Sequence, residues 1–123
     1  MKKTDLQIIE KVKFYCLEIS KILDGVDAKK LASDEQIYAD KRYACSLCLM
    51  QIGELANKLT NQFATEYNEF DWKNAYKLRN IIGHDYEKLS TNALYQAGKY
   101  ASTKLYEYTE KIITKEYTKP NNR

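Results

Sequence analysis

Hydrophobic residues in the first half of this chain recur every three or four positions, the period of an amphipathic helix. The first stripe predicts a helix over about residues 5–23, which Asp24 and Gly25 should end. Ser33-x-x-Gln36 offers a capping box for a long second helix that should end near Thr60 and Asn61. The two stripes are Ile9, Val12, Cys16, Ile19 and Leu23, and then Ala44, Cys48, Ile52, Leu55 and Leu59.

The second half continues the same period. Asp71 is a plausible cap for a third long helix, and Ser90-Thr91 can start a last one. Residues 28–31 and 62–68 are long enough only for short helical turns. The stripes are Trp72, Ala75, Leu78 and Ile82, and then Leu94, Gly98, Ala101, Leu105, Tyr108 and Ile112.

Long amphipathic helices with short connections predict an all-α fold, an up-and-down four-helix bundle with an additional short helix. The chain has 123 residues with only 4 glycines and 1 proline, so turn signals for a many-stranded protein are scarce. We expect a single helical domain over residues 1–115 and a polar, disordered tail over 116–123.

Charge, hydropathy and cysteine content limit the partners, location and cofactors that we expect for this chain. The formal net charge is +3, which is compatible with an anionic partner but smaller than the positive charge typical of a dedicated nucleic-acid-binding protein. The absence of a long apolar run favours a cytoplasmic protein without a membrane segment. Cys45 and Cys48 have the spacing of a metal or redox pair, but they lie beside the apolar stripe of one helix, so we expect core packing, no metal and no cofactor.

Candidate chemistry concentrates in the segment Arg79-Asn80-Ile81-Ile82-Gly83-His84-Asp85-Tyr86, which contains the only histidine of the chain. Histidine can move a proton near neutral pH, and arginine can hold a phosphate. On a helix the two would lie about 140° apart, flanking a shallow gap over Gly83. The alternative interpretation makes Gly83 a helix C-cap, His84 a favourable charge at a helix end and Arg79 a cover for the hydrophobic edge.

These residues resemble a motif of the HepT-like proteins in the HEPN superfamily, which are helical bundles. The motif is an arginine followed directly by a polar residue, a histidine separated from the arginine by four to six residues, and a tyrosine two positions after the histidine. Arg79, Asn80, His84 and Tyr86 match it without a gap. Trp72 ahead of the motif and the stretch Ile52-Gly53-Glu54-Leu55-Ala56 are also similar to this branch.

The resemblance implies the toxin of a type VII toxin–antitoxin system, a metal-independent endoribonuclease. It would act as a homodimer whose two motifs face one another across a cleft. His84 would be the general acid or base, Arg79 would stabilise the transition state, and Asn80 would orient the histidine or the phosphate. A minimal nucleotidyltransferase antitoxin would neutralise the toxin by transferring AMP to Tyr86.

Several alternatives stay open at this point. Tyr86 is one of 11 tyrosines and could be an ordinary surface residue, and Glu54 is either a surface carboxylate or, as the resemblance suggests, the partner of Arg79. The lysines at positions 73, 77 and 88 flank the motif and could guide the RNA backbone or simply belong to a solvated charged face. The chain as a whole could instead be a non-catalytic helical subunit that binds nucleotides or substrates for a nucleotidyltransferase, or a structural dimer with a chance motif.

Overall fold

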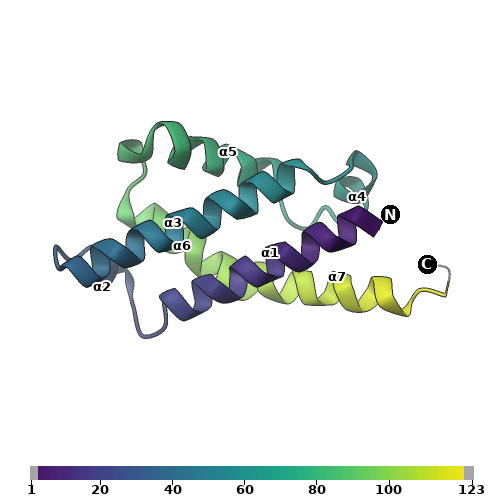
Figure 1. The fold of residues 1–123 in the computed structure, drawn as a ribbon, viewed down its shortest axis with the longest axis horizontal. Helices are drawn as coiled ribbons and strands as arrows, with labels where there is room; N and C mark the ends of the chain where they lie inside the picture. The colour runs from purple at the N-terminus through teal and green to yellow at the C-terminus, as the bar shows by residue number, and fades with distance from the viewer. Residues whose placement is uncertain (1–2, 121–123) are drawn as a thin grey trace.

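The computed structural model describes residues 3–120, and every regular element in that range is helical, which confirms the all-α prediction (Figure 1). The long helices follow the predicted stripes closely. In chain order the elements are α1 (Lys3–Ile22), α2 (Ala28–Leu31), α3 (Gln36–Asn57), α4 (Asn61–Glu66), α5 (Trp72–His84), the 3₁₀ turn η1 (Tyr86–Lys88), α6 (Thr91–Tyr100), the π-helical segment η2 (Ala101–Leu105) and α7 (Tyr106–Thr118).

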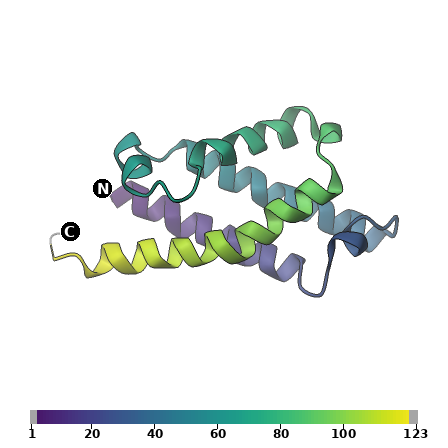
Figure 2. The same ribbon diagram turned by 180° about the vertical axis from the view of Figure 1, so that it is seen from behind.

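Helix α3 is the centre of the bundle: it packs against α5 on one side and against α1 and α6 on others. Helix α1 lies alongside α7, so the two ends of the described chain are at the same end of the molecule (Figures 1 and 2). The core contains fully buried side chains from several helices, among them Ile9 and Ile19 of α1, Cys45 of α3 and Leu105 of η2. None of the helices in residues 3–120 is long and apolar enough to cross a membrane.

Helix ends agree with the sequence in most places. Gly25 adopts a φ of +72° after α1, the left-handed conformation that a glycine allows at a helix end. The hydroxyl of Ser90 accepts a hydrogen bond from the Ala93 amide, and so caps α6. The predicted capping box at Ser33 is wrong, since Glu35 occupies the N-cap of α3 and the Ser33 hydroxyl accepts from the Glu35 amide instead.

The link between α3 and α4 is tied to the first helix. Helix α3 ends at Asn57, three residues before the predicted Thr60, because Thr60 caps the short helix that follows. The fully buried carboxylate of Asp5 accepts hydrogen bonds from the amide and the hydroxyl of Thr60, at 2.9 and 2.8 Å. These bonds fix the first turn of α1 to the start of α4.

The final helix is longer than the sequence suggested. It continues to Thr118, past the domain boundary expected at residue 115, because Glu116 is buried and the Tyr67 hydroxyl donates a hydrogen bond to it. Lys119 then pairs with Glu116 at 2.7 Å and with Glu66 at 3.2 Å. Residues 116–120 are therefore anchored to the bundle, while 121–123 of the expected tail lie outside the described residues.

Candidate functional site at the C-terminal half of α5

Helix α5 presents the motif. It starts where the Asp71 carboxylate accepts a hydrogen bond from the Asn74 amide at 3.0 Å, as the sequence predicted. Ala75 and Ile82 are buried against α3, which leaves the motif on a flank of the helix. The helix continues through His84, so Gly83 lies inside it and is not the C-cap of the alternative interpretation.

Helices α3 and α5 approach closely at Gly53. A Cβ atom there would lie 2.5 Å from the Cβ of Arg79 and 2.6 Å from the carbonyl oxygen of Ala75. Only glycine permits this contact without moving one of the helices. The close approach places Glu54, the next residue of α3, beside the Arg79 side chain.

Arg79 is held by an ion pair in which its Nε contacts Oε1 of Glu54. Of the two possibilities for Glu54, the paired one is therefore found in the structure. The rest of the guanidinium lies over Gly83, where Nη1 would be 2.8 Å from an added Cβ atom. Nη1 also lies 3.4 Å from Oδ1 of Asn80.

The guanidinium and the imidazole are close together. Nη1 of Arg79 lies 3.5 Å from Nε2 of His84, so the arginine covers the expected gap over Gly83. The angle of about 140° describes where the side chains leave the helix, whereas the long arginine side chain bends back across the glycine. Because a guanidinium can only donate, a hydrogen bond at this contact would use Nε2 of His84 as its acceptor.

Tyr86 lies just after the helix, at the start of η1, and is half-buried. Its hydroxyl is 3.4 Å from Oγ of Ser46, and its ring centroid is 6.3 Å from that of Tyr43. Both neighbours belong to α3. Tyr86 therefore contacts α3 nearer to its N-terminus than Arg79 does, and it is partly covered by Ser46 and Tyr43.

Exposed lysines surround this region. Lys73 and Lys77 lie on α5 and form no ion pair within residues 3–120, while Lys88 pairs with Asp85 at 3.0 Å. Lys73 and Lys77 are the stronger candidates for contact with an anionic backbone.

The cysteines are separate from the site. Cys16, Cys45 and Cys48 are buried free thiols, so core packing holds for the pair in α3. Burial, with a smaller contribution from Cys48, raises the pKa of Cys16 and of Cys45 to about 12, which keeps both thiols protonated. Within the described part of the chain, no group of three or more histidine, cysteine or acidic side chains is arranged to hold a metal ion.

Sequence reasoning missed the part of α3 that supports the motif. The Cε of Met50 would lie 3.3 Å from a Cβ on Gly83, a contact that the hydrophobic pattern of α3 does not predict. Nor does that pattern predict the contact between Ser46 and Tyr86. A signal was present, because Ser46, Met50 and Glu54 are spaced four residues apart and therefore share one face of the helix.

Comparison with known families agrees with this geometry. The family model described as "HepT-like: Ribonuclease HepT-like" matches residues 9–112, which include the motif and the supporting part of α3. Searches of curated proteins and of solved structures find no significant match. The match covers most of the chain, and the chain therefore belongs to the ribonuclease HepT-like family.

Proposed function

We propose that this protein is a metal-independent endoribonuclease and the toxin of a toxin–antitoxin pair, with Arg79 and His84 as its catalytic residues. One observation carries the proposal: Glu54 holds the Arg79 guanidinium so that Nη1 reaches 3.5 Å from Nε2 of His84. A proton acceptor and a fixed cation are thereby presented side by side on an open surface, in a chain of the ribonuclease HepT-like family. That pair has the two functions that RNA cleavage by the ribose hydroxyl needs.

The chemistry follows from the positions of the two groups. Nε2 of His84 takes the proton of a ribose 2′-hydroxyl, and the 2′-oxygen forms a bond to the adjacent phosphorus. The bond from phosphorus to the 5′-oxygen breaks, and that oxygen gains a proton from a second acid. Arg79 donates to the phosphoryl oxygens, where negative charge increases in the transition state. The products are a 2′,3′-cyclic phosphate and a 5′-hydroxyl.

The second acid is best supplied by a second subunit. The chain has one histidine, so an acid and a base of this kind require two copies or the help of water. Apolar side chains beside the motif support a homodimer: Tyr43 is 62% exposed, Leu47 58% and Ile81 41%. Tyr43 and Leu47 share the face of α3 that carries Glu54, so a partner that covers them would lie next to the catalytic groups.

Cleavage of RNA in the presence of EDTA tests the catalytic assignment. The wild-type protein should cut, and His84→Ala should cut at least about 100-fold more slowly because it loses the proton acceptor. Tyr117→Phe is a matched control, since this tyrosine is exposed and lies at the end of α7. Undiminished cleavage by His84→Ala would refute the assignment. No cleavage by wild type, together with tight binding of the nucleotidyltransferase, would favour the non-catalytic subunit instead.

Tyr86 is the proposed site of neutralisation. Its phenol oxygen would attack the α-phosphorus of ATP in the antitoxin, the new O–P bond would form as pyrophosphate leaves, and a base of the antitoxin would take the phenol proton. The adenylate would add bulk and negative charge near Arg79 and repel RNA. Because the hydroxyl lies near Ser46, the side chain must turn outward to react.

Intact mass after co-expression with the antitoxin tests this regulation. We expect one or more added AMP units in the wild-type toxin, none in Tyr86→Phe, and loss of RNA cleavage only in the modified protein. Tyr43→Phe is the matched control, because that exposed tyrosine is the aromatic neighbour of Tyr86. AMP addition that persists in Tyr86→Phe would overturn the assignment of the residue.

A further inference from the structure

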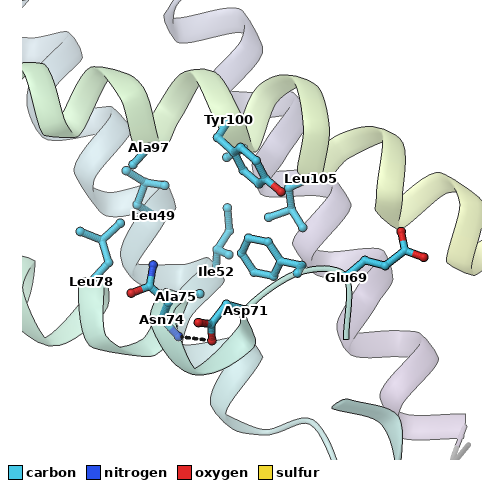
Figure 3. Close-up of a pocket in the computed structure, with 12 residues that line it drawn as sticks. Leu49, Ile52, Glu69, Asp71, Asn74, Ala75, Leu78, Ala97, Tyr100 and Leu105 are labelled. Carbon is cyan, nitrogen blue, oxygen red and sulfur yellow. Dashed lines mark hydrogen bonds between the residues drawn. The ribbon is translucent and has the colours of Figure 1, made fainter. Parts of the chain in front are cut away.

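A cavity of about 410 Å³ opens on the side of α5 that faces away from the motif. Leu49 and Ile52 of α3 form its floor, Leu78 of α5 forms one wall, and Tyr100 and Leu105 form the other (Figure 3). It exists because α5 packs mainly on α3 and makes few contacts with α6. The volume is in the range of small-ligand pockets, about 300–1,000 Å³.

The wall formed by the last helix is irregular. Residues Ala101–Leu105 form a π-helical turn between α6 and α7, and both ends of this turn line the cavity. Single π-helical turns inside longer helices cost hydrogen-bond quality and recur at functional sites. Here the turn keeps Ala101 and Leu105 buried on the cavity side, and Tyr100 remains 45% exposed at the rim.

The polar groups at one end of the cavity are acidic. Glu69 and Asp71 line that end together with Asn74, and neither carboxylate forms an ion pair within residues 3–120. Figure 3 shows Asp71 next to Asn74, whose amide group lies on the cavity side, while the Glu69 carboxylate extends outward. Among the described residues that line the cavity, none is a lysine or an arginine.

Aromatic rings complete this end. Phe70 and Tyr100, both lining residues, are stacked with centroids 5.9 Å apart and planes 24° apart. Stacked rings favour a flat apolar body and attract a cation over their faces. For a phosphate-bearing molecule, RNA included, the only charged side chains among the described lining residues are negative and would repel it.

We propose that this cavity is a binding site for a small organic cation with a flat ring and an alkylammonium group, an arylalkylamine, and that the site is separate from the catalytic motif. The ring lies over Leu49, Ile52 and Leu78. The ammonium group donates hydrogen bonds at the end formed by Asp71 and Asn74, within the negative field of Glu69. This proposal does not depend on the proposed nuclease function.

Titration calorimetry with two isosteric probes of opposite charge tests the site on the full-length protein. Tryptamine should bind, and indole-3-propionate should bind about tenfold more weakly or not at all. The preference for tryptamine over indole-3-propionate should decrease as the salt concentration is raised, because the carboxylates at the cavity rim are exposed to solvent. In the double variant Glu69→Gln, Asp71→Asn the preference should fall at least fivefold. Asparagine also caps helices, so α5 is expected to remain intact.

Asp34→Asn serves as the control, because it removes one exposed carboxylate ahead of α3 and should leave the preference unchanged. Backbone NMR shifts induced by tryptamine should cluster at Leu78, Tyr100 and their neighbours. Equal affinity for the two probes, an unchanged preference in the double variant, or shifts centred elsewhere would each overturn the proposal. A second copy of the chain could also occupy the cavity and keep tryptamine out. A dimer that the double variant disrupts, with no tryptamine binding, would therefore overturn the proposal as well.

Discussion

The guanidinium of Arg79 lies over Gly83, with Nη1 only 2.8 Å from the position that a Cβ atom would occupy. A methyl group there would force the arginine tip away from His84, although the side chain is flexible enough to move at little cost. Gly83 is therefore important for the position of a side chain, and much less for the fold.

Gly83→Ala should separate activity from stability. We expect RNA cleavage to fall about tenfold or more, because small displacements of catalytic groups are costly. The free energy of unfolding should stay unchanged or rise by up to about 1 kcal/mol, since alanine favours a helix interior. Urea denaturation and a cleavage assay on the same preparation check both parts. A variant as active as wild type would show that the Arg79 position over Gly83 is unimportant.

Gly53→Ala should have the opposite effect, with a large loss of stability. Its Cβ would meet the backbone oxygen of Ala75 at 2.6 Å, so α3 and α5 would have to separate. We expect a loss of about 1–3 kcal/mol in the free energy of unfolding, measured by urea denaturation. Ala28→Gly, in the short helix α2, should stay within about 1 kcal/mol. Wild-type stability in Gly53→Ala would contradict the close packing.

Glu54→Gln tests the ion pair that holds Arg79. The side chains of Arg79 and Glu54 are 23% and 41% exposed, so the pair should contribute no more than about 1 kcal/mol to stability. Its loss should lower kcat about 10-fold or more, with a smaller effect on KM, because the guanidinium is no longer fixed for the transition state. Glu66→Gln removes one of the two ion pairs of Lys119, far from the motif in sequence, and should leave kcat unchanged. An unchanged kcat in Glu54→Gln would argue against a positioning role.

The thiols provide a prediction about reactivity. Because burial raises the pKa of Cys16 and Cys45 to about 12, their thiolate fraction near pH 8 is very small. Labelling with iodoacetamide at pH 8, followed by intact mass, should leave both unmodified in the native protein and modify all three cysteines in urea. Rapid labelling of Cys16 or Cys45 in the native state would show that this part of the core opens easily.

Acid should weaken the anchor of the last helix. Burial alone would raise the pKa of Glu116, but hydrogen bonds from Lys119 and Tyr67 lower it below its ordinary value. The unfolded chain therefore binds the proton more readily, so this contribution to stability is present above the unfolded pKa of about 4.3 and is lost as pH falls through the folded pKa. Urea denaturation from pH 6 to about 3 should show a steeper loss for wild type than for Glu116→Gln. Parallel curves would contradict the anchor.

Periodicity was sufficient to predict the bundle but not its irregular parts. The spacing from Gly98 through Ala101 to Leu105 is that of a regular helix, and nothing in it signals the π-helical turn. After that turn Thr109 is buried, where the sequence favoured Tyr108. The burial of Glu116 depends on Tyr67, a partner distant in sequence, and the polar composition of the last residues does not indicate that contact.

The candidate site shows the same division. The motif residues were identifiable because a lone histidine and an arginine share one short segment. The short distance between the guanidinium and the imidazole could not be predicted, since a helical projection gives side-chain directions at the backbone and ignores the length of an arginine side chain. The contribution of Met50 depends on how α3 and α5 cross, which no local pattern encodes.

The identity of the RNA ends tests the central claim most directly. With EDTA present, wild-type protein should leave a 2′,3′-cyclic phosphate and a 5′-hydroxyl at each new cut, and neither His84→Ala nor Arg79→Ala should produce them at a comparable rate. Cuts that require a divalent metal, cuts that leave a 5′-phosphate, or the same ends at the same rate from His84→Ala would contradict the proposed roles of Arg79 and His84.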